Sequence, residues 1–362
     1  MKTMQQLFES ALAKAAFEGM DPSRFDEIAS NTIKEMLPTL ASEVIAQLRA
    51  TAPAMLKHYR GEWGGFGRRI KRRWGKAIDQ LEIVWATCWE TGAKFNATHR
   101  PKAAQSSDYR FEALTHLHAR GLLTAREIIC LVEGGFPDGA LSRWRTLHEI
   151  AVTAQFLKQE DVKISYRYLA SFHHNARNAA LQHNRHASRM NLEPFTPKEL
   201  ALLEKRVKEF GGPGGLKKYD WALPALPPGR PPTFEAVEFA TKMHRWRPYY
   251  TWSSQPVHAA FRPARNSASE SPKPILLAGP SDSGHVNPLQ LTALSLASLH
   301  SALFSIDPTF DDLVAIKVVA ELSKEVGPFA VKLERKRLQR KVRAKQTRPA
   351  KTVAKNRSTP GR

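Results

Sequence analysis

Apolar positions recur every three or four residues along most of the chain, which is the period of an amphipathic α-helix. The clearest example runs from Phe111 to Gly134, with an apolar face made of Leu114, Leu117, Leu122, Ala125, Ile128, Ile129 and Val132. The pair Gly134-Gly135 is expected to end this helix, because glycine tolerates the left-handed conformation common at helix C-termini. A second helix is predicted from Asp138 to Gln159, and a third from Asp161 to Met190. Three long helices joined by short turns are typical of an antiparallel bundle.

Helical patterns also flank this central region. Residues 3–56 predict two or three amphipathic helices, and the glycine-rich run at 61–67 is expected to interrupt them before a basic helix begins near Arg68. Further on, an uncharged core helix is predicted from Val286 to Ile306, and another helix from about Asp311. No stretch alternates with the period of two that marks a strand. The predicted fold class is therefore all-α, an antiparallel helical bundle with an N-terminal helical extension.

The polar stretch at 94–107 is where we expect the domain boundary. The predicted organisation is an N-terminal helical region with the basic helix at 1–100, the bundle domain at 105–328, and a basic segment at 329–362. Residues 329–343 have the composition of a continuing basic helix. Beyond Ala344 the sequence has two prolines and no apolar face, so a disordered basic tail is expected.

Positive charge is concentrated in two stretches of the chain. The net charge is +21, of which Lys57 to Lys76 supplies +7 and Lys332 to Arg362 supplies +12. Such runs attract phosphate-bearing polymers through counterion release, and anionic membrane surfaces less specifically. We therefore expect nucleic acid as a partner. The candidate binding residues are Arg68, Arg69, Lys71, Arg72, Arg73, Lys336, Arg337, Arg340 and Lys341.

Cysteine usage and hydropathy predict a cytoplasmic protein without a membrane span. The two cysteines, Cys88 and Cys130, lie inside apolar helical patterns and form neither a disulfide framework nor a metal-type pair. The N-terminus lacks the apolar core of a signal peptide. The uncharged stretch at 286–306 has the length of a membrane span but contains eight polar side chains, so a buried core helix is the better interpretation.

The central predicted helix carries three polar residues on one face. At about 100° per residue, Arg145, His148 and Glu149 lie within about 100° of one another, whereas Arg143 points about 160° away from Arg145. One interpretation is a structural Arg145–Glu149 ion pair at i,i+4 with a hydrogen-bonded histidine beside it. The other is a site in which a guanidinium holds a phosphate while an imidazole moves a proton. The spacing fits both.

A second polar segment, residues 249–258, is the expected partner of that helix in space. Tyr250, Ser254 and His258 are spaced by four and share a face if the segment is helical, although Pro256 disturbs this pattern. A Ser–His pair suggests a hydrolase, but the chain has no Gly-x-Ser-x-Gly elbow. Hydrogen bonding within the bundle, or a second histidine for the Arg145 and His148 pocket, fits the pattern better.

Metal binding is not expected, and neither is a cofactor. His183 and His186 have the i,i+3 spacing of a shared ligand pair, but no acidic residue lies between His174 and Asn191 to complete a site. We interpret these histidines as part of a polar helix face.

Three motifs together resemble a known family. The run from Gly135 to Glu149, the segment from Tyr166 to His174, and the run from Tyr250 to His258 look like the motifs of the bacterial domain-of-unknown-function family 5677, over roughly residues 105–305. The resemblance implies a helical bundle, in a group often suspected of HEPN-like behaviour. It implies no established activity.

The spacing of Arg143 and His148 also fits the Arg, four-to-six residues, His pattern of the HEPN superfamily of ribonucleases and toxins. In that superfamily the two residues act in metal-independent RNA cleavage, usually across a dimer, so RNA and a homodimer are the implied partners. On an undistorted helix, however, Arg143 and His148 lie about 140° apart.

Two functional hypotheses follow. The first is a HEPN-like metal-independent ribonuclease or toxin in a stress or phage-defence role, with catalytic candidates His148, Arg145, Arg143, Glu149, Ser254 and His258. The second is a non-catalytic nucleic-acid-binding or scaffold protein in which the Arg145–Glu149 pair is structural.

Overall fold

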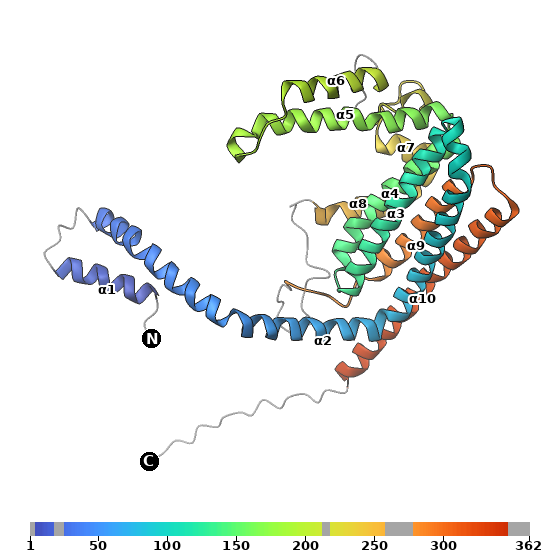
Figure 1. Cartoon of the computed structure of the whole chain (residues 1–362). Helices are drawn as coiled ribbons and strands as arrows, with labels where there is room; N and C mark the ends of the chain where they lie inside the picture. The colour runs from blue at the N-terminus through green and yellow to red at the C-terminus, as the bar shows by residue number, and fades with distance from the viewer. Residues whose placement is uncertain (1–3, 18–24, 212–217, 258–277, 347–362) are drawn as a thin grey trace. The chain divides into compact units, whose positions relative to one another are not determined.

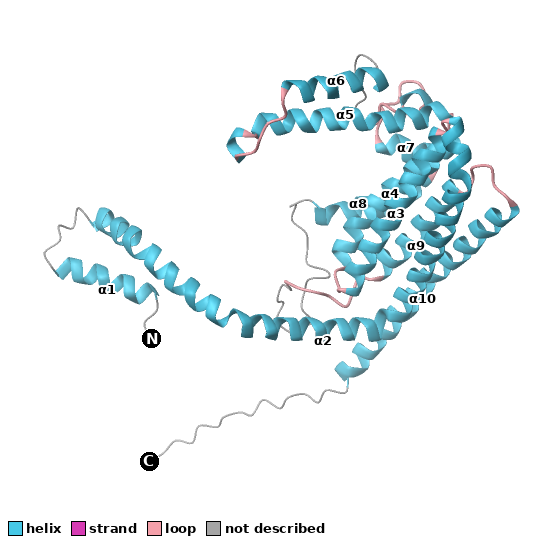
Figure 2. Cartoon of the chain, viewed as in Figure 1, coloured by secondary structure: helices cyan, strands magenta, loops and turns pink. Residues whose placement is uncertain are grey.

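The protein was analysed as a computed structural model that describes residues 4–17, 25–211, 218–257 and 278–346. The described residues form ten α-helices with short 3₁₀ segments and contain no strand, which confirms the predicted all-α class (Figures 1 and 2). The helices are α1 (Met4–Phe17), α2 (Phe25–Ser106), α3 (Tyr109–Glu133), α4 (Pro137–Gln159), α5 (Val162–His186), α6 (Pro197–Gly211), α7 (Phe234–Ala240), α8 (Arg247–Ser254), α9 (Val286–Leu303) and α10 (Phe310–Gln346).

The chain divides into two compact units, Met1–Phe66 and Gly67–Arg362. The first unit contains α1 and the N-terminal part of α2, and the second contains the rest of α2 and all later helices. The predicted interruption at residues 61–67 was wrong, because α2 continues through it. A helical glycine costs only about 1 kcal/mol relative to alanine, so a glycine-rich run weakens a helix without ending it.

The bundle of the second unit is built around α3, α4 and α9, which pack against one another, while α10 packs on α9. The largest fully buried side chains include Trp74 of α2, Phe111 and Ile128 of α3, and Trp144 and Phe156 of α4. The predicted succession of three long helices with short connections is confirmed by α3, α4 and α5. Helix α5 packs on α6, and these two helices extend together beyond the bundle in Figure 1.

The uncharged segment at 286–306 forms the core helix α9, as predicted. Its buried residues include Leu289, Leu296 and Leu299, and polar members such as Thr292 and Ser295 are buried with them. Within the described part of the chain, no helix is long and apolar enough to cross a membrane.

Residues 94–107, predicted as a polar connection, are helical as far as Ser106. The polar residues of this stretch pair with neighbouring elements: Arg100 lies 2.6 Å from Glu112 of α3, and Lys102 lies 2.8 Å from Asp307. Phe95 in the same stretch is buried. The helix ends at Ser107, whose φ of 51° is left-handed. The solvated face of a long helix is as polar as a linker, which is why polarity alone predicted a connection at residues 94–107.

Helix α10 joins two predicted pieces into one. The helix predicted from Asp311 and the basic helix predicted at 329–343 are continuous through Pro328. The segment beyond Gln346, for which disorder was predicted, lies outside the described residues.

Candidate functional site

Helix α4 begins at a turn that the sequence specifies. Gly135 has a φ of +81°, which a side chain would strain, and Phe136 is the N-cap residue ahead of Pro137 in the first turn. Asp138, where the sequence pattern placed the start of this helix, lies inside the first turn, and its negative charge interacts favourably with the positive end of the helix dipole. The backbone N–H of Ser281 donates to the Gly135 carbonyl at 2.8 Å and ties the turn to the segment before α9.

His148 lies inside the bundle with an acidic partner. The side chain of His148 is 1% exposed and that of Glu238 is fully buried, and His148 Nε2 lies 2.8 Å from Glu238 Oε1. Because a carboxylate oxygen only accepts, Nε2 is the nitrogen that carries the proton. The other oxygen of Glu238 lies 2.8 Å from Nε of Arg247. The result is a buried chain of three groups from α4, α7 and α8.

Arg145 and Glu149 form a second pair, on the neighbouring part of the same helix face. Arg145 Nε lies 3.5 Å from Glu149 Oε1, and the hydroxyl of Tyr250 donates to the same carboxylate oxygen at 2.6 Å. The Arg145 guanidinium also lies 4.7 Å from the centre of the Tyr250 ring. Burial, and then the hydrogen bond to Glu149, raise the pKa of Tyr250 to about 12, so this tyrosine remains a donor at neutral pH.

Tyr250 connects the two pairs. Its ring centre lies 5.9 Å from that of His148, and the Arg247 guanidinium lies 5.4 Å from it. Helix α8, which contains the first part of the segment at 249–258, therefore contacts the polar face of α4, as the sequence suggested. Two arginines, two glutamates, a histidine and a tyrosine are joined here by ion pairs and hydrogen bonds. Three of their buried atoms, Arg145 Nε, Glu238 Oε2 and Arg247 Nη2, make no hydrogen bond within the described residues.

Two of the remaining catalytic candidates, Arg143 and Ser254, have their partners outside this pair of ion pairs. Arg143 forms an ion pair with Glu127 of α3 and points away from His148, as the helical spacing indicated. The Ser254 hydroxyl donates to the Tyr250 carbonyl at 2.9 Å, a bond within its own helix turn. His258 lies outside the described residues. Among the described residues, Arg143 and His148 therefore do not pair, and the Ser254 hydroxyl is bonded within its own helix turn.

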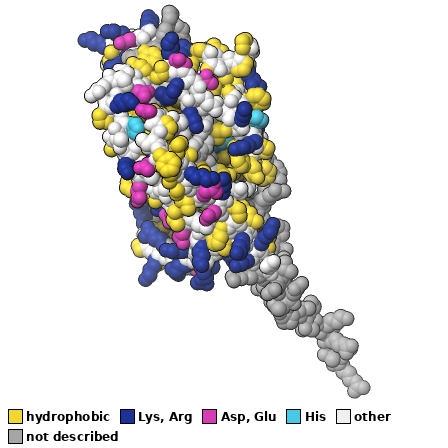
Figure 3. Space-filling view, turned by 90° about the vertical axis from the view of Figure 1, so that its right-hand side faces the viewer, with side chains coloured by type: hydrophobic (Ala, Val, Ile, Leu, Met, Phe, Trp, Pro, Cys, Tyr) yellow, Lys and Arg dark blue, Asp and Glu magenta, His cyan; other side chains and the backbone are white. Residues whose placement is uncertain are grey.

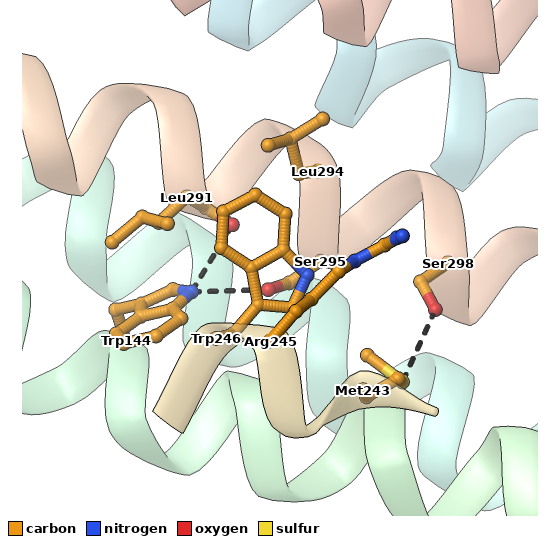
Figure 4. Close-up of a pocket in the computed structure, with 8 residues that line it drawn as sticks. All are labelled: Trp144, Met243, Arg245, Trp246, Leu291, Leu294, Ser295 and Ser298. Carbon is orange, nitrogen blue, oxygen red and sulfur yellow. Dashed lines mark hydrogen bonds between the residues drawn. The ribbon is translucent and has the colours of Figure 1, made fainter. Parts of the chain in front are cut away.

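A small pocket lies next to the network, between α4, α9 and the 3₁₀ segment Met243–Trp246 (Figure 4). Its volume is about 110 Å³, room for a few waters but below the roughly 300 Å³ at which small-molecule sites begin. Trp144 donates to Ser295 Oγ at 3.0 Å in its wall, so this polar group is already satisfied. His148 is not among the lining residues, which are Trp144, Met243, Arg245, Trp246, Leu291, Leu294, Ser295 and Ser298.

No group of three or more metal-ligating side chains occurs among the residues that the structure describes. His183 Nε2 donates to the Glu193 carbonyl at 2.8 Å, and the imidazole ring packs against Phe195. This histidine therefore helps to close the turn between α5 and α6.

The two basic stretches meet at one acidic residue. The Asp282 carboxylate forms an ion pair with Arg73 of α2 and lies 3.3 Å from Nη1 of Arg337 on α10. The indole N–H of Trp74 donates to the Asp282 carbonyl at 3.1 Å. Segments more than 250 residues apart in the sequence are therefore side by side, and Figure 1 shows the C-terminal end of α10 beside α2.

Arg337 differs from the other predicted nucleic-acid-binding residues, because its side chain is only 7% exposed. Besides Asp282, it makes two hydrogen bonds to Glu334, at 2.7 and 2.8 Å. We therefore assign Arg337, with Arg73, to holding the two basic helices together. A buried guanidinium that is paired with two carboxylates, as in Arg337, has little left to offer a phosphate, and Arg73 is already paired with Asp282.

The other basic residues of this region are exposed. We call basic surface the set formed by Arg68, Arg69, Lys71, Arg72 and Lys76 of α2 and Lys336 of α10. On α2 they lie opposite the buried face that contains Ile70, Trp74 and Ala77. Figure 3 shows Lys and Arg side chains gathered at the lower end of the view, the end at which α10 finishes in Figure 1. The side chains of Arg340 and Lys341 lie outside the described residues.

Sequence reasoning missed Glu238, Arg247 and Asp282. Glu238 had one signal, since it lies between Val237 and Phe239 in a short, mostly apolar helix. Such an acid must be paired when that helix is buried. Asp282 lies in an irregular segment, and nothing in its neighbourhood predicts two arginine partners from distant helices.

Residues 111–273 match a family described as Family of unknown function (DUF5677). The resemblance to this family is thus confirmed, over a shorter range than the predicted 105–305. No curated protein and no solved structure matches the chain. The matched region contains the network around Glu238 and Tyr250, whereas the basic surface lies outside it.

Proposed function

We propose that the protein binds nucleic acid through the basic surface, by contacts to the phosphate backbone and without catalysis at His148. The observation that carries this proposal is the Asp282 bridge, because it brings two separate basic stretches into one region. Phosphate contacts by lysine and arginine supply most of the affinity of non-specific nucleic-acid binding. Six exposed cations on two adjacent helices fit that role.

The buried network supports a binding role over a catalytic one. A general acid or base must come within hydrogen-bond reach of the substrate, and His148 is sealed in the bundle with Glu238. Arg143, the partner that the HEPN pattern requires, is paired on α3. No contact in the described structure favours the ribonuclease hypothesis, which stays a prediction.

The test is fluorescence anisotropy with a labelled 20-nucleotide RNA and a 20-base-pair DNA over a salt series. The variant replaces Arg72, Lys76 and Lys336 by glutamine. We expect it to bind at least about tenfold more weakly at 100 mM salt, with a shallower dependence of affinity on salt, by about 0.7 to 0.9 per lost phosphate contact. The matched control replaces Lys163, Lys198 and Lys205, three exposed lysines of α5 and α6, and should bind like the wild type.

Three results would contradict the proposal. Equal binding by both triple variants would show that the basic surface is not the site. Binding to vesicles rich in phosphatidylserine, without binding to either oligonucleotide, would point to a membrane surface. Cleavage of the RNA in EDTA, lost in His148→Asn, would favour the ribonuclease hypothesis.

A further inference from the structure

Large apolar side chains lie exposed along one face of α2 in the first unit. Most of them are separated by three, four or seven residues, which keeps them on a single face of the helix. A contiguous exposed patch of this size marks an interaction surface. We call apolar stripe the following residues, which are 37–63% exposed: Ile33, Leu37, Val44, Ile45, Leu48, Met55, Leu56, Tyr59 and Trp63.

The apolar stripe repeats every eleven residues. Ile33, Val44 and Met55 form one series, and a second series at the same spacing consists of Leu37, Leu48 and Tyr59. Eleven residues make three turns at about 3.67 residues per turn, close to the 3.6 of a straight helix. The stripe therefore stays on one side of α2 over its whole length, which is the pattern of a helix that packs along another long helix.

The length of the stripe limits what can cover it. From Ile33 to Trp63 the helix rises by about 45 Å at roughly 1.5 Å per residue. Helix α1 has 14 residues and would span only about 21 Å. A partner for the whole stripe must be a long helix with the same repeat, and a second copy of α2 has both properties.

The charge along this part of α2 selects a direction for such a pair. Residues 25–44 contain four acidic residues and one lysine, whereas residues 45–66 contain three Lys or Arg residues and one glutamate. Two parallel copies would set like charges against each other. Two antiparallel copies set the acidic half of each helix against the basic half of the other, which is the favourable arrangement.

From these observations we propose that the protein forms a homodimer in which the apolar stripes of two α2 helices pair in antiparallel orientation. The centre of the pair lies close to Leu48, midway along the stripe. This pairing removes the exposed apolar side chains from water and is independent of the proposed nucleic-acid binding.

The first test is the mass of the full chain in solution, measured by light scattering and sedimentation at 1–100 µM. The stripe variant is Leu48→Glu with Met55→Glu, and the control is Ala46→Glu with Ala50→Glu, which adds the same charge on exposed positions away from the stripe. We expect a dimer for the wild type and the control. The stripe variant should dissociate with a constant raised roughly a hundredfold or more, because each glutamate would be buried without a partner. Circular dichroism checks that both variants keep their helical content.

The second test leaves the apolar stripe unchanged and measures whether the two α2 helices run parallel or antiparallel. A spin label at Ser30→Cys, in a chain with Cys88→Ser and Cys130→Ser, should report about 55 Å between copies in the antiparallel pair. A distance below about 20 Å would mean parallel helices and would overturn the antiparallel pairing.

Other outcomes overturn the dimer itself. A monomeric wild type at every concentration does so, and so does a stripe variant that remains dimeric. A monomeric wild type that becomes dimeric when residues 1–24 are deleted would identify α1 as the segment that covers the stripe.

Discussion

At the scale of single residues, the bundle buries three histidines that titrate far below their usual range. Burial lowers the pKa of His118 and of His285 to about 4, and burial together with the neighbouring His118 lowers the pKa of His300 to about 3. His118 Nε2 and His300 Nδ1 lie 3.4 Å apart, and His118 packs directly on Gly92. A side chain at position 92 would overlap the His118 ring.

These histidines predict a loss of stability in mild acid. Below pH 6.5 the unfolded chain takes up a proton at each histidine, whereas the folded chain does not do so until about pH 4. The free energy of unfolding should therefore fall as the pH is lowered from 6.5 to 4.5, by about 2 kcal/mol from His118 alone. Urea unfolding across this range measures the effect. His118→Gln should lower stability at neutral pH but flatten its dependence on pH, and an unchanged slope would contradict the assignment.

What could be predicted at this scale depended on distance along the chain. The Arg145–Glu149 pair followed from its i,i+4 spacing, and Arg143 was correctly placed on another face of the helix. Glu238 could not be identified as the partner of His148, because 90 residues separate them and only the packing of α7 against α4 brings them together.

At the scale of the helices, the position of the end of α10 depends on one loop residue. Asp282 pairs with Arg73 and Arg337, and its carbonyl accepts from Trp74. Removing the carboxylate leaves two guanidinium groups close together without their shared partner, one of them buried. A buried charge without its partner is costly, so the last turns of α10 should separate from α2.

The prediction concerns Asp282→Asn and is measured by amide hydrogen exchange. Protection should fall by at least about tenfold in residues 333–340 and stay unchanged in α3 and α4. The matched control is Asp307→Asn, which breaks the exposed pair with Lys102 and should change little. Equal exchange in both variants would show that the Asp282 bridge does not position the helix.

The helices that could be predicted are those whose pattern is unambiguous. The apolar periods of α3, α4 and α9 identify them, since a buried face repeats through each. Helix α2 could not be predicted in full, because glycine runs and polar stretches weaken a helical signal without stopping the helix. The end of α2 is set by the left-handed Ser107, followed by Asp108, which accepts from the N–H groups of Arg110 and Phe111.

At the scale of the whole molecule, the family match and the proposed functions occupy different parts of the chain. The matched residues, 111–273, include α4 and the polar network that holds α7 and α8 to it. The basic surface lies on α2 and α10, and the apolar stripe lies on the N-terminal part of α2. The two runs of Lys and Arg predicted the basic surface from sequence. The apolar stripe could not be predicted from its eleven-residue repeat alone, because only the structure shows that its side chains are exposed.

This separation predicts that the two proposed properties can be divided by removing residues 1–66. The remaining chain keeps the core residues Trp74, Phe111 and Trp144, and the Asp282 bridge, so it should fold as a monomer. Binding to a 12-nucleotide RNA, too short to reach two basic surfaces, should stay within about threefold of the full chain, because no member of the basic surface is lost. Light scattering measures the oligomeric state of the shortened chain, and fluorescence anisotropy on the same sample measures its affinity for the RNA. If the shortened chain is folded but dimeric, the apolar stripe is not the interface; if it is folded but no longer binds, the basic surface is not sufficient for binding.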